Sequence, residues 1–440
     1  MKEPTYHREL NRKILTGQPV RYGQWRGPGI SGQTGPADDK VLTYPRIGLY
    51  TGKGCSHSWL WFVDLFDRYG FYDLVLLDEN QIRGGALRSM DCLAVSGGDT
   101  IAMARGLGQK GAAELDVFLQ RGGLYLGSCA GAYLPLNSSK QHLLHFNFVP
   151  ARITNLTKEI PDSIRLPEKS LAPYGCSYIF HPVREDLELT ANGCPPFAGM
   201  GSFTAPLYGG PGLIPGESSD VLARYSGFTK KTLFLVDPEL ARETLIDKAA
   251  VIRNRQGSGV FYLFGPHFEH PYFPVANQIL TDCLYFELGY GNQRKKDSGE
   301  MPRYFLSGDS SRLWLKGLKR EISNARIVAC GLETHWIQWL IGNKIYEPLK
   351  IRFFLEAVWK RLDLLAPGPG LALAGDEEKS LTDQSRQLTF FLRDLKNKID
   401  AGQDTLFLAE KLFQELQLFT RRFLEIFFRT RLSAFPDNPN

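Results

Sequence analysis

Short apolar runs alternate with longer amphipathic segments from Arg46 onward. The runs read RIGLY, DLVLLD, CLAVSGG and LYLGSCAGAYL, and the segments between them include WLWFVDLFDRYG and a helical stretch that ends at Gln120. Strands that alternate with helices of about ten residues are typical of βαβ units. The pattern therefore predicts an α/β domain with a mostly parallel sheet that is covered on both faces.

The pattern becomes irregular over residues 137–250, where PPFAGMGSF, APLYGGPGLIPG and VLARYSG indicate short strands and turns. We interpret this region as an elaboration of the same domain. The alternation resumes in AAVIRNRQGSGVFYLFGPHFEHPYF. This segment predicts two strands joined by a Gly-Ser-Gly turn, followed by a loop that carries His267.

A different pattern begins after residue 300. Residues 345–365 and 381–399 space their apolar positions as helices do, and residues 366–380 between them indicate a linker. Aromatic side chains are frequent in this region, and they favour packing between helices, with a partner or oligomer interface as the alternative. They are Phe390, Phe391, Phe419, Phe423, Phe427 and Phe428.

Capping residues mark the ends of these helices. Ser380 with Asp383 indicates a cap for the helix that begins near residue 381. Gly402 indicates the end of that helix, and Asp404 can cap another helix that runs to about Leu432. We therefore expect a mostly helical C-terminal region.

The chain of 440 residues is long enough for two or three domains. We predict an extended arm over residues 1–40, an α/β domain over residues 41–295 and a helical domain over residues 300–440. Hydrophobic residues make up 43% of the chain and charged residues 22%, which is ordinary for a globular protein. Disorder is therefore not the main feature of this sequence.

The charge pattern narrows the class of partner. The net charge is +5, and the basic residues are scattered instead of forming long runs, so we expect no nucleic-acid partner. The sequence shows neither a secretory leader nor an apolar run of about 18 residues, so we expect a cytoplasmic protein without a membrane partner. The seven cysteines are dispersed without a CxxC pair, which argues against a disulfide framework or a zinc ribbon. We predict neither a metal nor a cofactor.

The most informative local motif is Gly127-Ser128-Cys129-Ala130-Gly131, which follows an apolar strand and precedes a helix-like segment. Glycines on both sides of a nucleophile permit the sharp strand-to-helix turn called a nucleophile elbow. The helix N-terminus would then stabilise a Cys129 thiolate. The alternative is a small buried cysteine in a glycine-rich turn.

A second motif supplies the partners that such a cysteine needs. His267 and Glu269 lie in one loop directly after the strand-like residues 260–264. The histidine would take up and return a proton, and the glutamate would orient its ring. The alternative is a structural histidine at the end of a strand.

The third motif is Ser96-Gly97-Gly98-Asp99 at the end of another strand. Gly97 and Gly98 leave room for backbone amides to face the nucleophile, and together with the Ala130 amide they could stabilise an oxyanion. The alternative is a tight turn that binds no ligand. For Asp99 we favour a helix cap over contact with a substrate.

Other histidines and cysteines are weaker candidates. Cys55 and His57 follow the first strand, and the edge of the sheet at which such loops lie is where ligands of α/β folds bind, so they can line a pocket. One Cys and one His without a second pair do not predict a metal site. His181 and His270 each precede a proline, and we interpret them as loop residues.

In this order the three motifs resemble the class I glutamine amidotransferases, which release ammonia from glutamine through a Cys-His-Glu triad. The closer likeness is to the amidotransferase-like N-terminal domain of fungal-type biotin protein ligases. It is carried by SGGDT, GGLYLGSCAGAY, YGGP and FGPHFE over residues 41–290. The resemblance implies a flavodoxin-like α/β sandwich, with Cys129 as nucleophile, His267 as base, Glu269 as its orienting group, and Gly98 with Ala130 as oxyanion donors.

The resemblance also implies a substrate-side loop at Tyr208, Gly209 and Gly210. Three departures from the family pattern limit what can be carried over. The sequence has no clear glutamine-recognition motif, no synthetase domain follows to receive ammonia, and the Gly-Arg-Gly-rich loop that forms biotinyl-adenylate is missing. Ligation of biotin is therefore not implied.

We predict a cysteine-dependent amidohydrolase or glutamine amidotransferase-like enzyme that attacks a small amide or acyl substrate through a thioester. The alternative is a non-catalytic binding or regulatory protein that retains the fold. In either case the C-terminal helices could bind a protein partner or a second copy of the chain.

Overall fold

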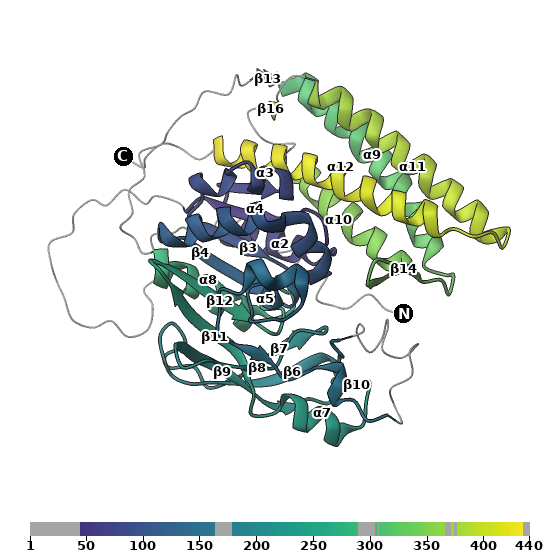
Figure 1. Ribbon diagram of the computed structural model, residues 1–440. Coiled ribbons are helices and arrows are strands. Elements are labelled where there is room, and N and C mark those ends of the chain that lie inside the picture. The colour runs from purple at the N-terminus through teal and green to yellow at the C-terminus, as the bar shows by residue number, and fades with distance from the viewer. Residues whose placement is uncertain are drawn as a thin grey trace, which may run out of the picture.

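The computed structural model describes residues 45–162, 178–288, 304–306, 308–365, 371–373 and 376–433. The predicted N-terminal arm over residues 1–40 lies outside these ranges, as does part of the predicted linker. Within them, twelve strands form one large sheet, and a group of long helices lies to one side of it (Figure 1).

The half of the sheet that follows the βαβ pattern is parallel, in the order β2-β1-β3-β4-β12. Its strands are β1 (Ile47–Tyr50), β2 (Leu74–Leu77), β3 (Cys92–Val95), β4 (Leu124–Ser128) and β12 (Gly259–Phe264). The chain moves from β1 to one side and then back across it to β3, so this half has a topological switch point. In such sheets the ligand site lies outside the carboxyl ends of the strands.

The other half of the sheet is antiparallel and is built by the irregular region of the sequence. The β11–β12 hairpin joins the two halves, and Gly257 at its turn has a φ of 60°, as the predicted Gly-Ser-Gly turn requires. The strands are β5 (Arg152–Ile153), β6 (Val183–Ala191), β7 (Ser202–Leu207), β8 (Leu213–Ile214), β9 (Ser219–Phe228), β10 (Leu233–Phe234) and β11 (Ala249–Gln256).

Helices cover both faces of the parallel half, because right-handed crossovers in opposite directions from β1 place them on opposite sides. On one face α2 (Trp59–Tyr69) lies beside α8 (Pro274–Leu288). The other helices of this part are α3 (Glu79–Arg83), α4 (Thr100–Gln120), α5 (Ala130–Tyr133) and α7 (Pro238–Leu245). The predicted α/β class is confirmed.

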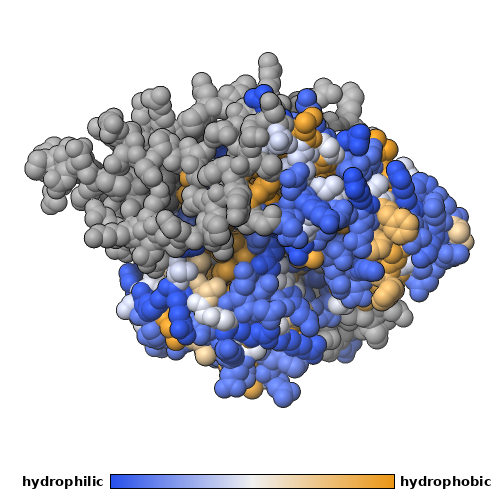
Figure 2. Space-filling view, turned by 90° about the horizontal axis from the view of Figure 1, so that it is seen from above, coloured by the Kyte–Doolittle hydropathy of each residue, from blue (hydrophilic) through white to orange (hydrophobic). Residues whose placement is uncertain are grey.

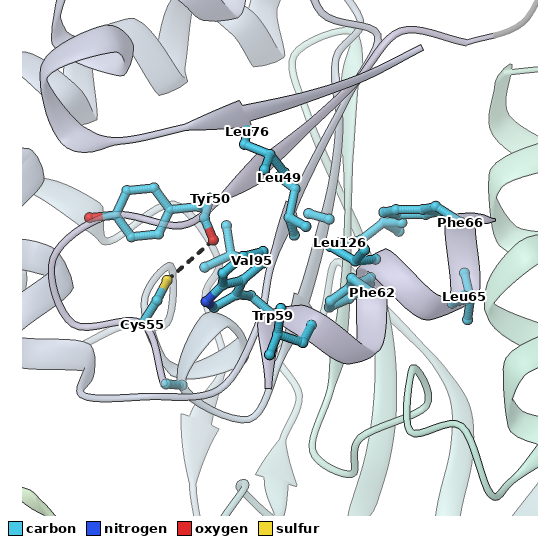
Figure 3. Packing of buried hydrophobic residues seen from close by; sticks show 14 of the residues in the cluster. Leu49, Tyr50, Cys55, Trp59, Phe62, Leu65, Phe66, Leu76, Val95 and Leu126 are labelled. Carbon is cyan, nitrogen blue, oxygen red and sulfur yellow. Dashed lines mark hydrogen bonds between the residues drawn. The ribbon is translucent and has the colours of Figure 1, made fainter. Parts of the chain in front are cut away.

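The core between the sheet and α2 is dense. Trp59, Phe62 and Phe66 point from α2 toward Leu49 and Leu126 of the sheet (Figure 3), and all five are fully buried. Burial of side chains of this size contributes about 1.5–3 kcal/mol each. This packing fixes α2 on the sheet and so fixes the loop that precedes it.

The C-terminal region is helical, as predicted, but it contains elements that the periodicity did not reveal. The missed elements are α9 (Gly308–Leu332) and a hairpin of β14 (Trp339–Ile341) and β15 (Lys344–Tyr346). The remaining elements are β13 (Tyr304–Leu306), α10 (Pro348–Leu365), β16 (Leu371–Leu373), α11 (Glu377–Asp400) and α12 (Leu406–Ser433). The short strand β16 lies within the stretch predicted as a linker, where it pairs with β13.

One capping prediction is wrong. Helix α11 begins one turn earlier than expected, after Asp376, so Ser380 and Asp383 are inside it. Three acidic residues at 376–378 favour the earlier start, because negative charge is stabilising at a helix N-terminus. The other end agrees with the prediction, since Gly402 has a φ of 65° and Asp404 accepts a hydrogen bond from the Leu406 amide.

Two arginines are prominent among the contacts that dock the C-terminal helices on the α/β domain. Arg421 of α12 donates to Asp78 (2.8 Å) and to the Leu76 carbonyl (3.2 Å), next to the edge strand β2. Arg361 of α10 is 1% exposed and lies 2.9 Å from Asp64 and 3.0 Å from Asp67 of α2. The second contact is an ion pair around a buried arginine, and it contributes to stability only while both partners are present.

The aromatic residues predicted to pack between the C-terminal helices do so with one exception. Five of the six are buried, whereas Phe390 is 65% exposed. Among the described helices, none is both long enough and apolar enough to cross a membrane.

We expect Arg361→Ala to lower the free energy of unfolding by about 3 kcal/mol, because the variant removes the buried cation shared by two half-buried carboxylates and leaves Asp64 with only Lys360. Urea denaturation measures the change. Arg386→Ala is the matched control, since both groups of the Arg386–Asp383 pair are exposed and the pair is worth less than about 1 kcal/mol. Equal effects of the two substitutions would contradict this account of docking.

Candidate active site

The loops that follow β1, β3, β4 and β12 meet at the carboxyl edge of the parallel half. They carry Ser58, Gly97, Cys129 and His267, and these residues line one cavity of about 1400 Å³. The structure thus brings together motifs that lie far apart in the sequence.

Cys129 has the strained backbone of a nucleophile elbow, with φ 50° and ψ −109°. The turn needs glycine on both sides. A Cβ on Gly127 would lie 2.4 Å from the Gly131 carbonyl oxygen, and one on Gly131 would lie 2.0 Å from the Val95 carbonyl oxygen. The Cys129 amide donates to the Phe264 carbonyl (3.0 Å), which holds the elbow against β12. Strain of this kind persists only where the surrounding structure imposes it.

The expected stabilisation of the thiolate by a helix N-terminus is not the main effect at Cys129. Helix α5 after the elbow has only four residues, so its dipole is small. Burial raises the pKa of the Cys129 thiol, but the neighbouring His267 imidazole more than offsets this, and the pKa is lowered overall. The acidity of the thiol therefore depends on His267.

His267 links the thiol to a carboxylate. Its Nδ1 lies 2.7 Å from Glu269 Oε1, and its imidazole is close enough to the Cys129 thiol for the two groups to shift each other's pKa. Burial alone would lower the pKa of His267, but Glu269 and Cys129 raise it to about 10. The arrangement favours a thiolate beside an imidazolium.

Glu269 is fully buried, and three donors converge on one of its oxygens. Oε1 accepts from Ser128 Oγ (2.7 Å) and Ser96 Oγ (3.1 Å) as well as from His267. Ser96 Oγ lies 2.9 Å from Ser58 Oγ, which extends the network toward the loop after β1. The other oxygen, Oε2, has no hydrogen-bond partner among the described residues. These contacts fix the orientation of the carboxylate and, through it, the imidazole ring.

Gly97 and Gly98, in the turn after β3, have different roles. A Cβ on Gly97 would lie 2.7 Å from His267 Cε1, so this glycine is required for the ring to sit where it does. Gly98 has a φ of 155°, and a Cβ there would meet the Gly54 carbonyl at 2.0 Å. Among the described residues, neither the Gly98 nor the Ala130 amide has an acceptor. Both amides border the cavity and could donate to an oxyanion.

Asp99 is a helix cap, as predicted, because its Oδ1 accepts from the Ile101 and Ala102 amides at the start of α4. Its second oxygen, Oδ2, accepts from Asn343 Nδ2 (2.9 Å) in the turn between β14 and β15. This bond brings the C-terminal region to the edge of the site.

Only part of the predicted substrate-side loop borders the cavity. Tyr208 and Gly209 line the cavity, and the Tyr208 ring centroid lies 5.9 Å from that of His267. Gly210 does not line it, since a Cβ there would meet the Gly265 carbonyl at 1.7 Å and the residue instead permits close packing against the end of β12. The prediction of Gly210 as a site residue is therefore not supported by its position.

Histidines and aromatic rings form one wall of the cavity. Trp61 lies 5.0 Å from His267 and 4.4 Å from His270, and His57 stacks on Phe353 of α10 at 5.0 Å. Burial lowers the pKa of His270 to about 3 and that of His57 well below its usual value, so both rings are neutral. His267 is thus the charged imidazole of this group.

Two sequence interpretations change here. His181 and His270 do lie outside helices and strands, but both also line the cavity. Cys55 does not: its thiol points to the Tyr50 carbonyl (3.2 Å), as Figure 3 shows, and burial raises its pKa strongly. Of the Cys55 and His57 pair, only His57 lines the cavity.

The C-terminal region also contributes to the cavity wall, which the sequence pattern did not predict. Its residues there include Asn343, Lys344, Lys350 and Phe353. A usable signal existed. The dipeptide Gly342-Asn343 separates the apolar WLI from KIY, and Gly-Asn between strand-like segments predicts a hairpin. Nothing in the local sequence indicates where that hairpin docks.

The cavity is basic. Seven Lys and Arg side chains line it against four Asp and Glu side chains. They are Lys140, Arg152, Lys158, Arg184, Lys248, Lys344 and Lys350, and Asp99, Glu185, Glu243 and Glu347. Among the described residues, no group of three or more His, Cys, Asp and Glu side chains could hold a metal ion.

The parallel sheet, the elbow and the loops at its carboxyl edge define an α/β domain with a glutamine amidotransferase-like fold. Within it, residues 49–142 match the family described as "Biotin-protein ligase, N terminal". This match confirms the predicted resemblance to the N-terminal domain of biotin protein ligases. The matched segment includes Cys129 and ends before His267.

Solved structures similar to the chain include a GMP synthase subunit from Thermoplasma acidophilum, with 13% identity, a TM-score of 0.35 and coverage of 56% of this chain and 98% of that chain. A glutamine amidotransferase from Thermotoga maritima has 10% identity, a TM-score of 0.32 and coverage of 56% and 85%. A ThuA-like protein from Bacteroides uniformis has 13% identity, a TM-score of 0.35 and coverage of 57% and 94%. No curated protein matches the chain significantly.

We expect the pH midpoint for alkylation of Cys129 by iodoacetamide to lie below about 8.5, the value of a free thiol, because a lowered pKa keeps the thiolate at lower pH. In His267→Ala the midpoint should rise above that value, since burial remains while the cation is lost. Peptide mass spectrometry measures the rate at each pH. His270→Ala is the matched control, because a neutral ring contributes no charge, and an equal shift in both variants would contradict the assignment.

We expect Gly97→Ala to reduce the Cys129 alkylation rate at pH 7 by roughly tenfold or more, because the added methyl group displaces the His267 ring from its place between thiol and carboxylate. Circular dichroism checks that the fold is kept. Gly201→Ala is the control, since a Cβ there meets nothing within 4 Å. An unchanged rate in Gly97→Ala would mean that the ring position is unimportant for reactivity.

Proposed function

We propose that this protein is a cysteine-dependent amide hydrolase or amidotransferase-like enzyme that acts on an amide or related acyl substrate through a thioester. The observation that carries the proposal is the placement of Cys129 at the wall of a large cavity beside His267, whose ring is hydrogen-bonded to the buried Glu269. The family match supports the fold and includes the nucleophile, but it leaves the substrate open.

In the first half of the reaction, the Cys129 thiolate attacks the carbonyl carbon of the amide. The carbonyl oxygen becomes an oxyanion, for which the Gly98 and Ala130 amides are the available donors. The C–N bond then breaks, and the His267 imidazolium gives its proton to the departing nitrogen. The products of this half are a thioester on Cys129 and a free amine or ammonia.

In the second half, water attacks the thioester carbon and gives a proton to the now neutral His267. The carbon–sulfur bond breaks, the acid leaves, and the thiolate–imidazolium pair is restored. Glu269 keeps Nδ1 of His267 protonated throughout, which directs the reactive Nε2 toward sulfur and substrate. The first half therefore consumes the thiolate–imidazolium pair, and the second half regenerates it.

A second candidate is a binding or regulatory protein that acts through its C-terminal helices. Ile327, Phe390 and Phe407 of α9, α11 and α12 are 72%, 65% and 81% exposed. In Figure 2 apolar patches appear among hydrophilic residues on the right, where these helices lie. A protein partner or second copy at these helices stays a prediction, and it is compatible with catalysis at Cys129.

We expect the wild-type protein to release ammonia or amine from at least one member of a panel of primary and secondary amides, and Cys129→Ala to lose about 10³-fold or more of that activity. Coupled ammonia detection and intact-protein mass spectrometry measure turnover and the acyl-enzyme. Cys194→Ala is the matched control, because this thiol is exposed and lies outside the cavity. A wild type with no turnover and an ordinary Cys129 alkylation midpoint would leave the binding function as the better account.

A further inference from the structure

The cavity next to Cys129 has a local excess of positive charge that the protein itself does not neutralise. Three of its four carboxylates have donors of their own: Asp99 caps α4 and binds Asn343, Glu185 accepts from the Tyr208 hydroxyl (3.1 Å), and Glu347 accepts from the Gln338 amide (3.4 Å). Among the described residues, the side chains of Arg184 and Lys344 form no ion pair, and the buried Arg184 Nε has no hydrogen-bond partner. Four arginine Nε atoms are buried without a partner among the described residues, and Arg184 is the one of these arginines that lines the cavity.

Lys344 reaches the site from the C-terminal region. It directly follows Asn343, whose amide is bound to Asp99, and a Cβ on the neighbouring Gly342 would lie 3.5 Å from the same carboxylate. The hairpin turn is thus held against the residue that follows Gly98. Lys344 is close enough to Cys129 to favour its thiolate.

Lys350 lies at the start of α10, in the same wall. Its ammonium donates to the Ile345 carbonyl and lies 5.3 Å from the Tyr346 ring centroid. One turn further along α10, Phe353 stacks on His57, which anchors this helix to the loop after β1. The position of Lys350 is therefore set by packing on both sides.

Arg184 faces these lysines from β6 in the antiparallel half of the sheet. The next residue, Glu185, has a φ of 69°, and this strained backbone directs successive side chains of the strand toward the cavity. Burial lowers the pKa of Lys350 to about 8, and its repulsion from Lys344 and Arg184 adds to this effect despite the opposing Glu347. Like charges held together in this way are stabilised by an anion between them.

We propose that Arg184, Lys344 and Lys350 bind a negatively charged oxyacid group, a carboxylate or a phosphate, carried by the acyl substrate that Cys129 attacks. This inference rests on the proposed function and assigns it a substrate class. The guanidinium offers a planar pair of donors and the two ammonium groups offer point charges, which suits an oxyanion more than a neutral amide. The C-terminal region then acts as one wall of the active site.

The test compares two alkylating reagents of similar size, neutral iodoacetamide and anionic iodoacetate, on the full chain. The measured quantity is the ratio of the iodoacetate rate to the iodoacetamide rate at Cys129, with the exposed Cys194 as the internal reference. We expect the ratio to be roughly tenfold or more higher at Cys129 than at Cys194, since a basic cleft concentrates anions. The ratio cancels any change in the thiolate fraction.

Lys344→Gln and Arg184→Gln should each bring the ratio toward that of Cys194, whereas Lys344→Arg should retain it. Lys110→Gln is the matched control, because Lys110 is an exposed residue of α4 outside the cavity. Rapid reaction of Cys129 with iodoacetamide, combined with equal ratios at the two cysteines, would overturn the anion site and leave the proposed enzyme intact. A Cys129 with an ordinary midpoint and no preference would overturn both.

A competition experiment identifies the oxyacid. Sodium phosphate or sodium acetate is added at constant ionic strength during alkylation by iodoacetamide. We expect one of these anions to slow the alkylation of Cys129 in the wild type but not in Lys344→Gln. The anion that protects more strongly indicates whether the substrate carries a phosphate or a carboxylate. Protection by neither, or protection that is unchanged in Lys344→Gln, counts against the site.

Discussion

The buried carboxylate of Glu269 determines the charge state of the groups around it. A carboxylate without access to water is stable only beside a cation or several donors, and here it has both. It raises the pKa of His267, and the imidazolium in turn lowers the pKa of the Cys129 thiol. Glu269 thus influences the acidity of the Cys129 thiol through the imidazole of His267.

The backbone has to be shaped to let these three side chains meet. The glycines that flank the elbow allow β4 to turn within one residue, and Gly97 leaves space for the ring of His267. The parallel strands supply the rigidity, because hydrogen bonds on both sides hold β4 between β3 and β12. Strain at Cys129 is therefore supported by elements that are themselves fully buried and regular.

Much of the fold and of the candidate site could be predicted from the sequence, because both depend on local patterns. The alternation of apolar runs predicted the parallel sheet, and the glycine spacing around Cys129 predicted the turn. What could not be predicted depends on contacts between distant segments. Neither the docking of α10 on α2 nor the Asn343–Asp99 bond leaves a trace in local periodicity, and the packing role of Gly210 depends on a carbonyl 55 residues away.

The hydrogen bond between Asp99 and Asn343 spans 244 positions of the chain. A ribosome adds residues one at a time, and domains generally fold as units during synthesis. The sheet with its elbow is therefore complete before the hairpin and α10 have left the ribosome. During that interval the residues of α10 and of the hairpin that line the cavity are not yet in place. The nucleophile is therefore synthesised and folded before the hairpin and α10, which supply part of the cavity wall in the finished molecule.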